Sequence, residues 1–524
     1  MSETTTRTGL ARELLAVQLP DGIGVCAGEE VFAGRGTLVE LRDPARDELA
    51  AEWRDPGAEG AEIALELATE GFRKWTGLGP SGRADVLRAT ARVIESNSHE
   101  LALLETATTG KPLRDTTAEL RAVVRMFSFY AGWAERINGE TLGVPDGWHA
   151  YTLLQPFGVV TAVTPWNAPI LTAAANALPA LAAGNAVIVK PSEFTPASTV
   201  RLARLFRTAG APLGALTAAP GLGPTTGAVL TTDPRVGKIV FIGSVETGRA
   251  VAAAAATAGI PSVLELGGKS ANVVFADADL EAAAAGALSA VFSGAGQSCQ
   301  AGSRLLVQKS VHDELLDRMV TGVGRLRVGD PMDTSTEIGP IVHRAQYDRV
   351  TRLLEVGLER GARQLNDTAL PRGITDHPFR EGNWIMPVLL DRVTRDNPLE
   401  HTEIFGPVLC VDTFDDEAEA MARANGTRFG LAGAVWTGDV SRAHRFAAGA
   451  EAGTFYINCY KAGHPLAPFG GFKASGWGRA SGRGVVEEFT QSKAVWLPTR
   501  PLAAPFPSLE GVLDPASAID GGRG

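Results

Sequence analysis

The sequence predicts an α/β fold built around a parallel sheet with helices on both faces. Between residues 158 and 268, five short β-favouring runs alternate with helical stretches, as in βαβ units. Polar or glycine-rich segments follow each run, and in an open α/β sheet such loops gather at the carboxyl ends of the strands, where ligands bind. The five predicted strands cover residues 159–163, 186–189, 216–219, 238–242 and 262–266.

The segments before this region are predicted to form its scaffold. Residues 1 to about 20 are polar, and we expect them to lack regular structure. Residues 31–55 combine β-favouring runs with Asp-Pro turns, which predicts an edge hairpin. Apolar residues then recur at three- and four-residue spacing, which predicts surface-packed helices at 61–75, 83–97 and 113–137.

Two other segments leave this pattern. Polar and apolar residues alternate in residues 144–158, around Trp148 and Tyr151. This alternation predicts a strand that reaches away from the main body, with a partner near residues 494–497. The chain after Thr499 is rich in proline, and we expect a tail or a strap over a neighbouring subunit.

Length and charge narrow the class of protein. A chain of 524 residues exceeds what one core usually supports, so we expect two or three domains. With 45% hydrophobic and 21% charged residues, the composition is that of a globular protein. The net charge is -10 and no cluster of five Lys or Arg occurs, which argues against nucleic acid or an anionic membrane as partner. Small molecules are better candidates.

Cysteine and histidine usage argues against disulfides and metals. Four cysteines, with no C-x-x-C and no Cys/His cluster, are too few for a disulfide scaffold or a zinc site.

The N-terminus lacks a signal-peptide core, and polar residues interrupt the small-residue run at 171–190, so we expect a cytoplasmic protein without a membrane span. We interpret three cysteines as packing residues and three histidines as surface groups on helices: Cys26, Cys410, Cys459, His312, His343 and His444.

The fourth cysteine, Cys299, has different surroundings. It lies in F-S-G-A-G-Q-S-C-Q-A-G-S-R at residues 292–304, where Gly294, Gly296 and Gly302 allow a substrate and a cofactor to approach the backbone. A thiol attacks carbon only as thiolate, which forms where N–H groups or cations surround an exposed sulfur. The loop predicts a nucleophile, and a buried packing cysteine stays open as the alternative.

The strand ends offer candidate nucleotide contacts. Gly243 and Ser244 precede a predicted helix, whose N-terminus suits a pyrophosphate. The glycine-rich turn at 221–227 has one residue too many for G-x-G-x-x-G, so an ordinary loop stays open. Lys190 and Glu193 follow a strand closely and suit either ribose hydroxyls or a surface ion pair.

With these residues assembled, the chain resembles the NAD(P)-dependent aldehyde dehydrogenase superfamily from about Leu38 to Trp496. Seven motifs carry the resemblance: Y-A-G-W-A at 130–134, T-P-W-N at 164–167, K-P-S-E at 190–193, L-E-L-G-G-K at 264–269, G-Q-S-C-Q-A-G-S-R at 296–304, E-I-F-G-P at 403–407 and P-F-G-G-F-K-A-S-G at 468–476.

The resemblance implies three parts and a homodimer or homotetramer. They are a Rossmann-like cofactor domain, an α/β catalytic domain and a small β extension that serves oligomerisation. The implied bounds are 20–143 with 159–268 for the cofactor domain, 269–483 for the catalytic domain, 144–158 with 484–499 for the extension, and 1–19 and 500–524 for the tails.

It also implies roles for single residues. Cys299 is similar to the nucleophile that forms a thiohemiacetal, and Glu265 to the base that activates water to hydrolyse the resulting thioester. The Asn167 amide and the Cys299 N–H resemble an oxyanion hole. No metal is implied. The implied cofactor contacts are Trp166, Lys190, Glu193, Gly223, Gly243, Ser244, Glu403 and Phe405.

Glu193 favours NAD over NADP, because a carboxylate beside the ribose 2′-hydroxyl repels a 2′-phosphate. Three departures from the family pattern concern details. Ile242 stands where many members have Thr, Ala480 where many have a Glu linked to proton removal, and Gln491 where several have Glu at an interface.

The fourth departure concerns the substrate. Positions that are aromatic in members acting on small aldehydes are small here, which predicts a bulkier aromatic, terpenoid or medium-chain aldehyde. They are Ala168, Ala175, Ser293 and Gly463. Two alternatives stay open. A CoA-acylating semialdehyde dehydrogenase is disfavoured by Glu265, and a non-catalytic relative is disfavoured by the joint presence of Cys299, Asn167 and Glu265.

Overall fold

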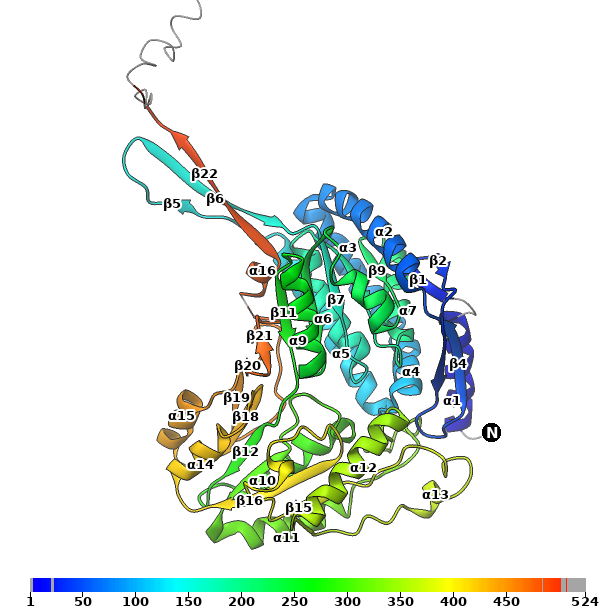
Figure 1. Ribbon diagram of the computed structural model, residues 1–524, viewed down its shortest axis with the longest axis vertical. Coiled ribbons are helices and arrows are strands. Elements are labelled where there is room, and N and C mark those ends of the chain that lie inside the picture. The colour runs from blue at the N-terminus through cyan, green and yellow to red at the C-terminus, as the bar shows by residue number, and fades with distance from the viewer. Residues whose placement is uncertain (1–2, 20–22, 483, 501–505, 507–524) are drawn as a thin grey trace, which may run out of the picture.

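Two mainly parallel sheets form the body of the molecule (Figure 1). A computed structural model describes residues 3–19, 23–482, 484–500 and 506. The first sheet has eight strands and a central run of five parallel ones. In order across the sheet they are β2 (Glu30–Ala33), β1 (Ile23–Ala27), β9 (Leu216–Ala218), β8 (Ala186–Lys190), β7 (Val159–Val163), β10 (Val236–Ile242), β11 (Ser262–Glu265) and β21 (Gly476–Trp477).

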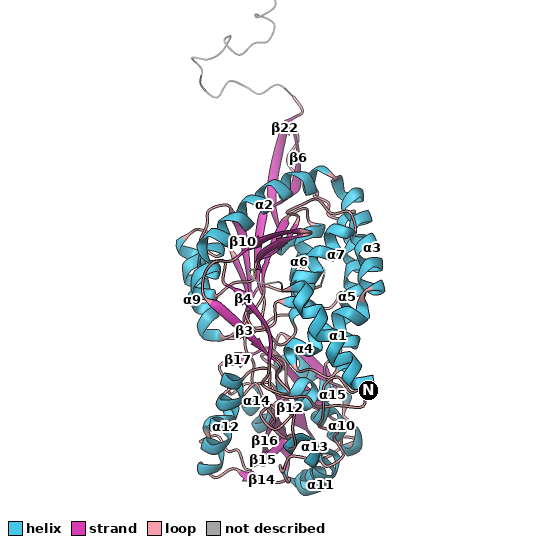
Figure 2. Ribbon diagram, turned by 90° about the vertical axis from the view of Figure 1, so that its right-hand side faces the viewer, coloured by secondary structure: helices cyan, strands magenta, loops and turns pink. Residues whose placement is uncertain are grey.

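All five predicted strands are therefore confirmed, with ends that differ by one or two residues. The central strands are buried on both sides because helices cover both faces of the sheet (Figure 2). The covering and connecting helices are α2 (Gly57–Gly77), α3 (Gly79–Ser96), α4 (Ser98–Thr109), α5 (Leu113–Ala134), α6 (Pro169–Ala182), α7 (Ala197–Thr208), α8 (Ala228–Leu230) and α9 (Val245–Thr257), with a short π-helical turn at Gly223–Gly227 before α8.

The second sheet has seven strands, six of them parallel. In order they are β14 (Arg363–Gln364), β15 (Val388–Asp391), β16 (Val408–Phe414), β13 (Arg304–Gln308), β12 (Ala271–Val274), β18 (Ala432–Trp436) and β19 (Thr454–Ile457). Its helices are α10 (Leu280–Phe292), α11 (His312–Val323), α12 (Arg344–Glu359), α13 (Arg372–Thr375), α14 (Glu417–Ala424) and α15 (Val440–Gly449). β17 (Phe429–Gly430) and β20 (Phe472–Lys473) form a separate pair.

A third sheet extends away from the body (Figures 1 and 2). It joins β22 (Thr490–Pro498), β6 (Trp148–Pro156) and β5 (Thr141–Leu142), and α16 (Val485–Glu488) leads into β22. Ala494 pairs with Thr152 and Leu497 with His149, so the predicted partner of the projecting strand is confirmed. The domain boundaries inferred from the resemblance stay a prediction. The proline-rich end lies outside the described residues apart from its first residues and Phe506.

The N-terminus corrects the sequence-based expectation. Residues Glu3–Gln18 form helix α1, which contacts α4, α7 and β4 (Leu49–Arg54), so the expected lack of regular structure is wrong. The predicted hairpin at 31–55 is confirmed as β3 (Leu38–Arg42) paired with β4, although Glu30–Ala33 joins the main sheet as β2. Among the described residues, no helix combines the length and apolarity that crossing a membrane requires.

Candidate active site

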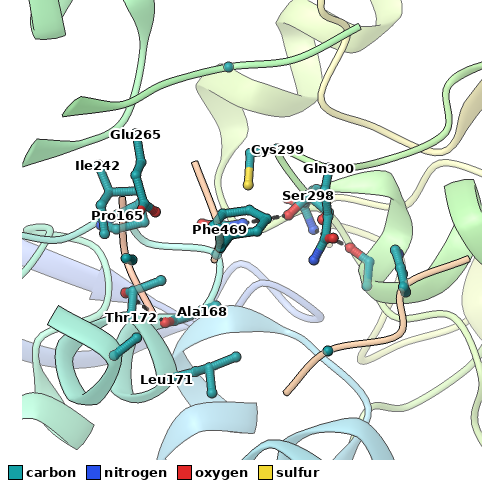
Figure 3. Close-up of a pocket in the computed structure, with 18 of the residues that line it drawn as sticks. Pro165, Ala168, Leu171, Thr172, Ile242, Glu265, Ser298, Cys299, Gln300 and Phe469 are labelled. Carbon is teal, nitrogen blue, oxygen red and sulfur yellow. Dashed lines mark hydrogen bonds between the residues drawn. The ribbon is translucent and has the colours of Figure 1, made fainter. Parts of the chain in front are cut away.

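A cavity of about 1260 Å³ brings the three predicted catalytic residues together. Asn167 lies between β7 and α6, Glu265 ends β11, and Cys299 lies between α10 and β13. Figure 3 shows the Cys299 sulfur pointing into this cavity, with Leu171 and Thr172 of α6 on the facing wall. Parts of both sheets thus supply one site, although long stretches of sequence separate the three residues.

The turn before Cys299 needs an unusual backbone. Gly294 and Gly296 have φ angles of 64° and 71°, and Ala295 between them has 53°. A side chain at 296 would lie 2.0 Å from the Gly406 carbonyl oxygen, so only glycine fits there. The glycines therefore turn the chain out of α10 and bring Cys299 against the loop at 403–407.

Asn167 is held by a residue that the sequence analysis missed. The Asn167 side-chain amide donates to the Gln297 carbonyl at 2.8 Å. The Gln297 side chain is buried and accepts a hydrogen bond from the Val342 N–H at 3.0 Å, which anchors this backbone. Gln297 lies within the quoted motif, but no sequence feature distinguished its role from that of a loop residue.

Cys299 is a neutral thiol at rest. Burial raises its pKa to about 12, and the negative charges of Glu265 and Glu403 raise it further, against hydrogen bonds from backbone N–H groups. At rest the surrounding N–H groups are outweighed by the loss of water and by the two acids, so the thiol keeps its proton. The sulfur must lose its proton during the reaction.

Glu265 is also protonated at neutral pH. Burial raises its pKa to about 8, while the Arg479 charge and the Ala480 N–H lower it. One carboxyl oxygen, Oε1, is buried without a hydrogen-bond partner among the described residues. Ala480 stands at the position where many relatives carry Glu, and it contributes the backbone N–H. Ile242 pairs with Glu265 across the sheet and lines the cavity.

Five of the predicted cofactor residues line this cavity: Trp166, Gly243, Ser244, Glu403 and Phe405. The exposed Ser244 begins α9, and its hydroxyl accepts a hydrogen bond from the Thr247 N–H at 3.1 Å. Burial raises the pKa of Glu403 to about 7, and the Gly268 N–H donates to its carboxyl at 2.9 Å.

Two side chains of α12 fasten the loop that carries Glu403 and Phe405. Arg349 donates to the Glu403 carbonyl at 2.7 Å, and Gln346 donates to the Phe405 carbonyl at 2.8 Å. Phe405 has a φ of 58° and packs edge-on against Trp166 at 5.2 Å. The sequence analysis missed Arg349 and Gln346 because both are ordinary polar residues of an amphipathic helix.

Lys190, Glu193 and Gly223 do not line the cavity. The Lys190 side chain is buried and donates to the Pro191 carbonyl at 3.1 Å. Its pKa is lowered by burial, although the charges of Glu193 and Asp55 act in the opposite direction, so these residues lie near one another. Gly223 is exposed in the turn before α8.

His343 is not the predicted surface group. It caps α12 and stacks on Phe194 with ring centroids 4.1 Å apart, and burial lowers its pKa to about 4. Trp166 lies edge-on to it at 5.5 Å. Cys26 and Cys410 are buried as predicted, whereas Cys459 is exposed and not a packing residue.

The four small residues of the predicted substrate pocket all line the cavity. They are Ala168, Ala175, Ser293 and Gly463. A Cβ atom added at Gly463 would meet no atom within 4 Å, so the cavity wall is open at this position. Tyr456 of β19, and Lys461 and Phe469 in the loops after β19, line the same cavity and were missed, because their places depend on how these segments pack.

A cysteine, an amide donor and a buried carboxyl at the edges of two mainly parallel sheets are typical of an enzyme that works through a cysteine nucleophile. Sequence comparison gives the family. A model of the aldehyde dehydrogenase family matches residues 32–495, and the chain belongs to that family. The predicted resemblance and enzyme class are thereby confirmed, and the alternative of a non-catalytic relative is set aside.

Named relatives cover nearly the whole chain. A betaine aldehyde dehydrogenase of Sinorhizobium fredii is 38% identical over 481 residues, which are 91% of this chain and 98% of that protein. A (Z)-2-((N-methylformamido)methylene)-5-hydroxybutyrolactone dehydrogenase of Acinetobacter baylyi is 38% identical and covers 88% of this chain and 95% of its own.

Solved structures confirm the predicted fold class. Betaine aldehyde dehydrogenase from Staphylococcus aureus in complex with NAD+ has a TM-score of 0.90 at 32% identity, over 95% of this chain and 99% of that one. Indole-3-acetaldehyde dehydrogenase of P. syringae, also with NAD+, has a TM-score of 0.89 at 35% identity, over 94% and 99%.

Proposed function

We propose that this enzyme oxidises a bulky aldehyde, of aromatic, terpenoid or medium-chain type, to the carboxylic acid. Aldehyde oxidation itself follows from the family. The observation that supports a bulky substrate is the substrate side of the cavity beside Cys299, whose wall carries Ala175 and Gly463 where a small-aldehyde enzyme needs rings. The P. syringae relative is named for an aromatic aldehyde.

The cofactor is NAD, which the relatives of known structure hold. The residues here fit it. The α9 N-terminus with Ser244 suits a pyrophosphate, and Glu403 suits ribose hydroxyls. A side chain on Gly267 would lie 2.1 Å from a Glu403 carboxyl oxygen, so glycine leaves the room that this carboxyl occupies.

The remaining cofactor roles are part of the proposal. Lys190 and Glu193 bind the adenosine ribose, Gly223 lines its approach, and Gly243 lets the pyrophosphate approach the backbone. Trp166 and Phe405 face the nicotinamide riboside. When bound, NAD accepts the hydride that leaves the carbon attacked by sulfur.

The proposed chemistry uses three side chains. Cys299 gives its proton to solvent, and the sulfur attacks the aldehyde carbon to form a thiohemiacetal. The Asn167 amide and the Cys299 N–H donate to the developing alkoxide, an interaction typically worth about 2.7–4 kcal/mol. After oxidation to the thioester, Glu265 takes a proton from water, which attacks the carbonyl carbon and releases Cys299 and the acid.

Because several relatives are named for betaine aldehyde, that cationic aldehyde is a second candidate substrate. A quaternary ammonium group is typically held by several aromatic faces. Trp166 and Phe405 pack together at the predicted cofactor side of the cavity, and Phe429 packs with Val245 at the start of α9. Tyr456 and Phe469 are the aromatic residues of the lining that remain. We therefore propose an aldehyde without such a cation.

An aldehyde panel tests this proposal. Purified protein with NAD is assayed by absorbance of the reduced nicotinamide on acetaldehyde, octanal, citral, phenylacetaldehyde and betaine aldehyde, with Cys299→Ala as the inactive control. We expect kcat/KM to be highest for one of the bulky neutral aldehydes, and Gly463→Phe to lower it for them more than for acetaldehyde. A clear preference of the unmodified enzyme for acetaldehyde would overturn the proposal.

The CoA-acylating alternative is tested in the same assay. Because Glu265 lies in the cavity with Cys299, we propose that water and not CoA resolves the thioester. The rate of NADH formation should be the same with and without CoA, and an acyl-CoA product would favour the alternative. A cytoplasmic location and a homo-oligomeric state are further proposals.

A further inference from the structure

The substrate side of the cavity carries charged residues that the proposed chemistry does not use. They are Lys111, Asp115, Glu119, Arg125 and Lys461. A charge near a site that excludes water acts strongly on a charged ligand, since the surroundings screen it less than bulk water does. Which of these charges is already neutralised by a neighbour therefore decides what the cavity attracts.

Three of the five have ion-pair partners. Lys111 Nζ lies 2.5 Å from Glu119 Oε2 and 3.7 Å from Glu105 Oε1. Arg114 Nε lies 2.9 Å from Asp115 Oδ1. Asp115 and Glu119, the two acids at this end of the cavity, are therefore each neutralised by a neighbouring cation.

Lys461 differs from them. Within the described part of the chain it has no ion-pair partner, and its one hydrogen bond, to the Ser289 carbonyl, is long at 3.5 Å. Its backbone φ is 57°, a conformation that costs a non-glycine residue energy and is often found at functional sites. The chain therefore holds this side chain at the cavity wall at a conformational cost.

The surroundings of Lys461 leave it charged at neutral pH. Burial lowers its pKa to about 8, against the neighbouring Cys299, Asp115 and Glu119, which raise the pKa when they are ionised. The interaction with Cys299 places the ammonium group within electrostatic reach of the reacting sulfur. A half-buried cation in such a position is stabilised by any anion that enters the cavity.

We propose that Lys461 binds an anionic group at the end of the substrate remote from the aldehyde, so that the preferred substrates are aldehydes bearing a carboxylate. This inference rests on the proposed function, which supplies the bulky aldehyde, and adds the charge of its far end. A carboxylate gives Lys461 the charged partner that it lacks, whereas the quaternary ammonium of betaine aldehyde is repelled by it.

The test compares two matched series of aldehydes. Linear ω-oxo-carboxylates of increasing length are assayed beside n-alkanals of the same length, with the unmodified enzyme, Lys461→Met and Lys461→Arg. Because a hydrogen bond between charged groups contributes about 1.5–3 kcal/mol, the ratio of kcat/KM for oxo-carboxylate to alkanal should fall roughly 10- to 100-fold in Lys461→Met, through KM. Lys461→Arg should keep most of the ratio.

Arg125→Met is the matched control, since Arg125 lines the outer, exposed part of the cavity. It should change the ratio less than Lys461→Met does. The inference is overturned if Lys461→Met leaves the ratio unchanged at every chain length. If the unmodified enzyme prefers long alkanals but gains nothing from a carboxylate, only the role of Lys461 fails. If it prefers acetaldehyde to all longer alkanals, the proposed function fails instead.

Discussion

Cys299 and Glu265 lie in one cavity, and the negative charge of Glu265 makes the Cys299 thiolate less stable. Burial holds both groups neutral at rest, with pKa values of about 12 and about 8. Because Glu265 is still protonated when the thiol gives its proton to solvent, the pair avoids two adjacent anions. This pairing is a property of the folded site and has no signature in the residue types.

The Glu265 pKa predicts a pH dependence. A protonated carboxyl cannot accept a proton from water, so thioester hydrolysis should slow as pH falls below about 8. In single-turnover experiments on the unmodified enzyme, the hydrolysis rate should rise tenfold per pH unit below this value and level off above it. A midpoint near 4.5, the ordinary value for Glu, would show that burial does not control this group.

Glu193 gives a prediction on cofactor choice. If its carboxylate accepts the hydrogen bond of the ribose 2′-hydroxyl, Glu193→Ser should remove repulsion of a 2′-phosphate and raise kcat/KM for NADP relative to NAD. Glu246→Ser, which removes an acid at the α9 end of the cavity, is the control. An unchanged preference in Glu193→Ser would contradict the assignment.

At the residue scale, the motifs predicted which side chains lie together in the site. They predicted neither the protonation states of these side chains nor the hydrogen bonds that hold them in place. Asn167, Glu265 and Cys299 were predicted and do share a cavity. Gln297 and Arg349 were missed, because their importance lies in hydrogen bonds to backbone atoms of distant loops. Such contacts follow from tertiary packing, which a single sequence does not specify.

At the element scale, the parallel strands were predictable because each is a short apolar run followed by a loop. Helix α1 was not. Three consecutive threonines and few apolar residues give it little helical pattern, yet Ala11 and Leu15 are buried in contacts with α4, α7 and β4. Packing, and not intrinsic preference, stabilises this helix.

Leu15→Ala tests that account of α1. Leu15 is fully buried, so we expect the substitution to lower the free energy of unfolding by about 2–5 kcal/mol, measured by chemical denaturation. Leu10→Ala in the same helix is the control, because Leu10 is 40% exposed and should change stability by less than about 0.5 kcal/mol. Equal effects of the two substitutions would mean that α1 does not pack as described.

At the scale of the whole molecule, the sheet of β22, β6 and β5 projects from the body (Figure 1). It carries exposed apolar side chains. Trp148 and Trp496 meet edge-on at 5.9 Å, and Leu497 is 56% exposed. A projecting apolar sheet needs a covering surface. This arrangement supports the proposed homo-oligomer. No pattern in the sequence indicates which surface of the partner subunit covers this sheet.

Trp496→Glu combined with Leu497→Glu should therefore lower the mass in solution measured by light scattering, because two charges cannot be buried at an apolar interface without partners. Val440→Glu, at an exposed site on α15, is the control and should leave the mass unchanged. If the double variant keeps the mass of the unmodified protein and that mass exceeds one chain, this sheet is not the interface.

The covalent route through Cys299 is tested most directly by intact-mass spectrometry of Glu265→Gln mixed with NAD and a bulky aldehyde. Without the base that activates water, we predict that the protein gains the mass of one acyl group, that peptide mapping places it on Cys299, and that Glu265→Gln with Cys299→Ala gains none. Turnover by Glu265→Gln at the rate of the unmodified enzyme, or an acyl group on another residue, would contradict the mechanism.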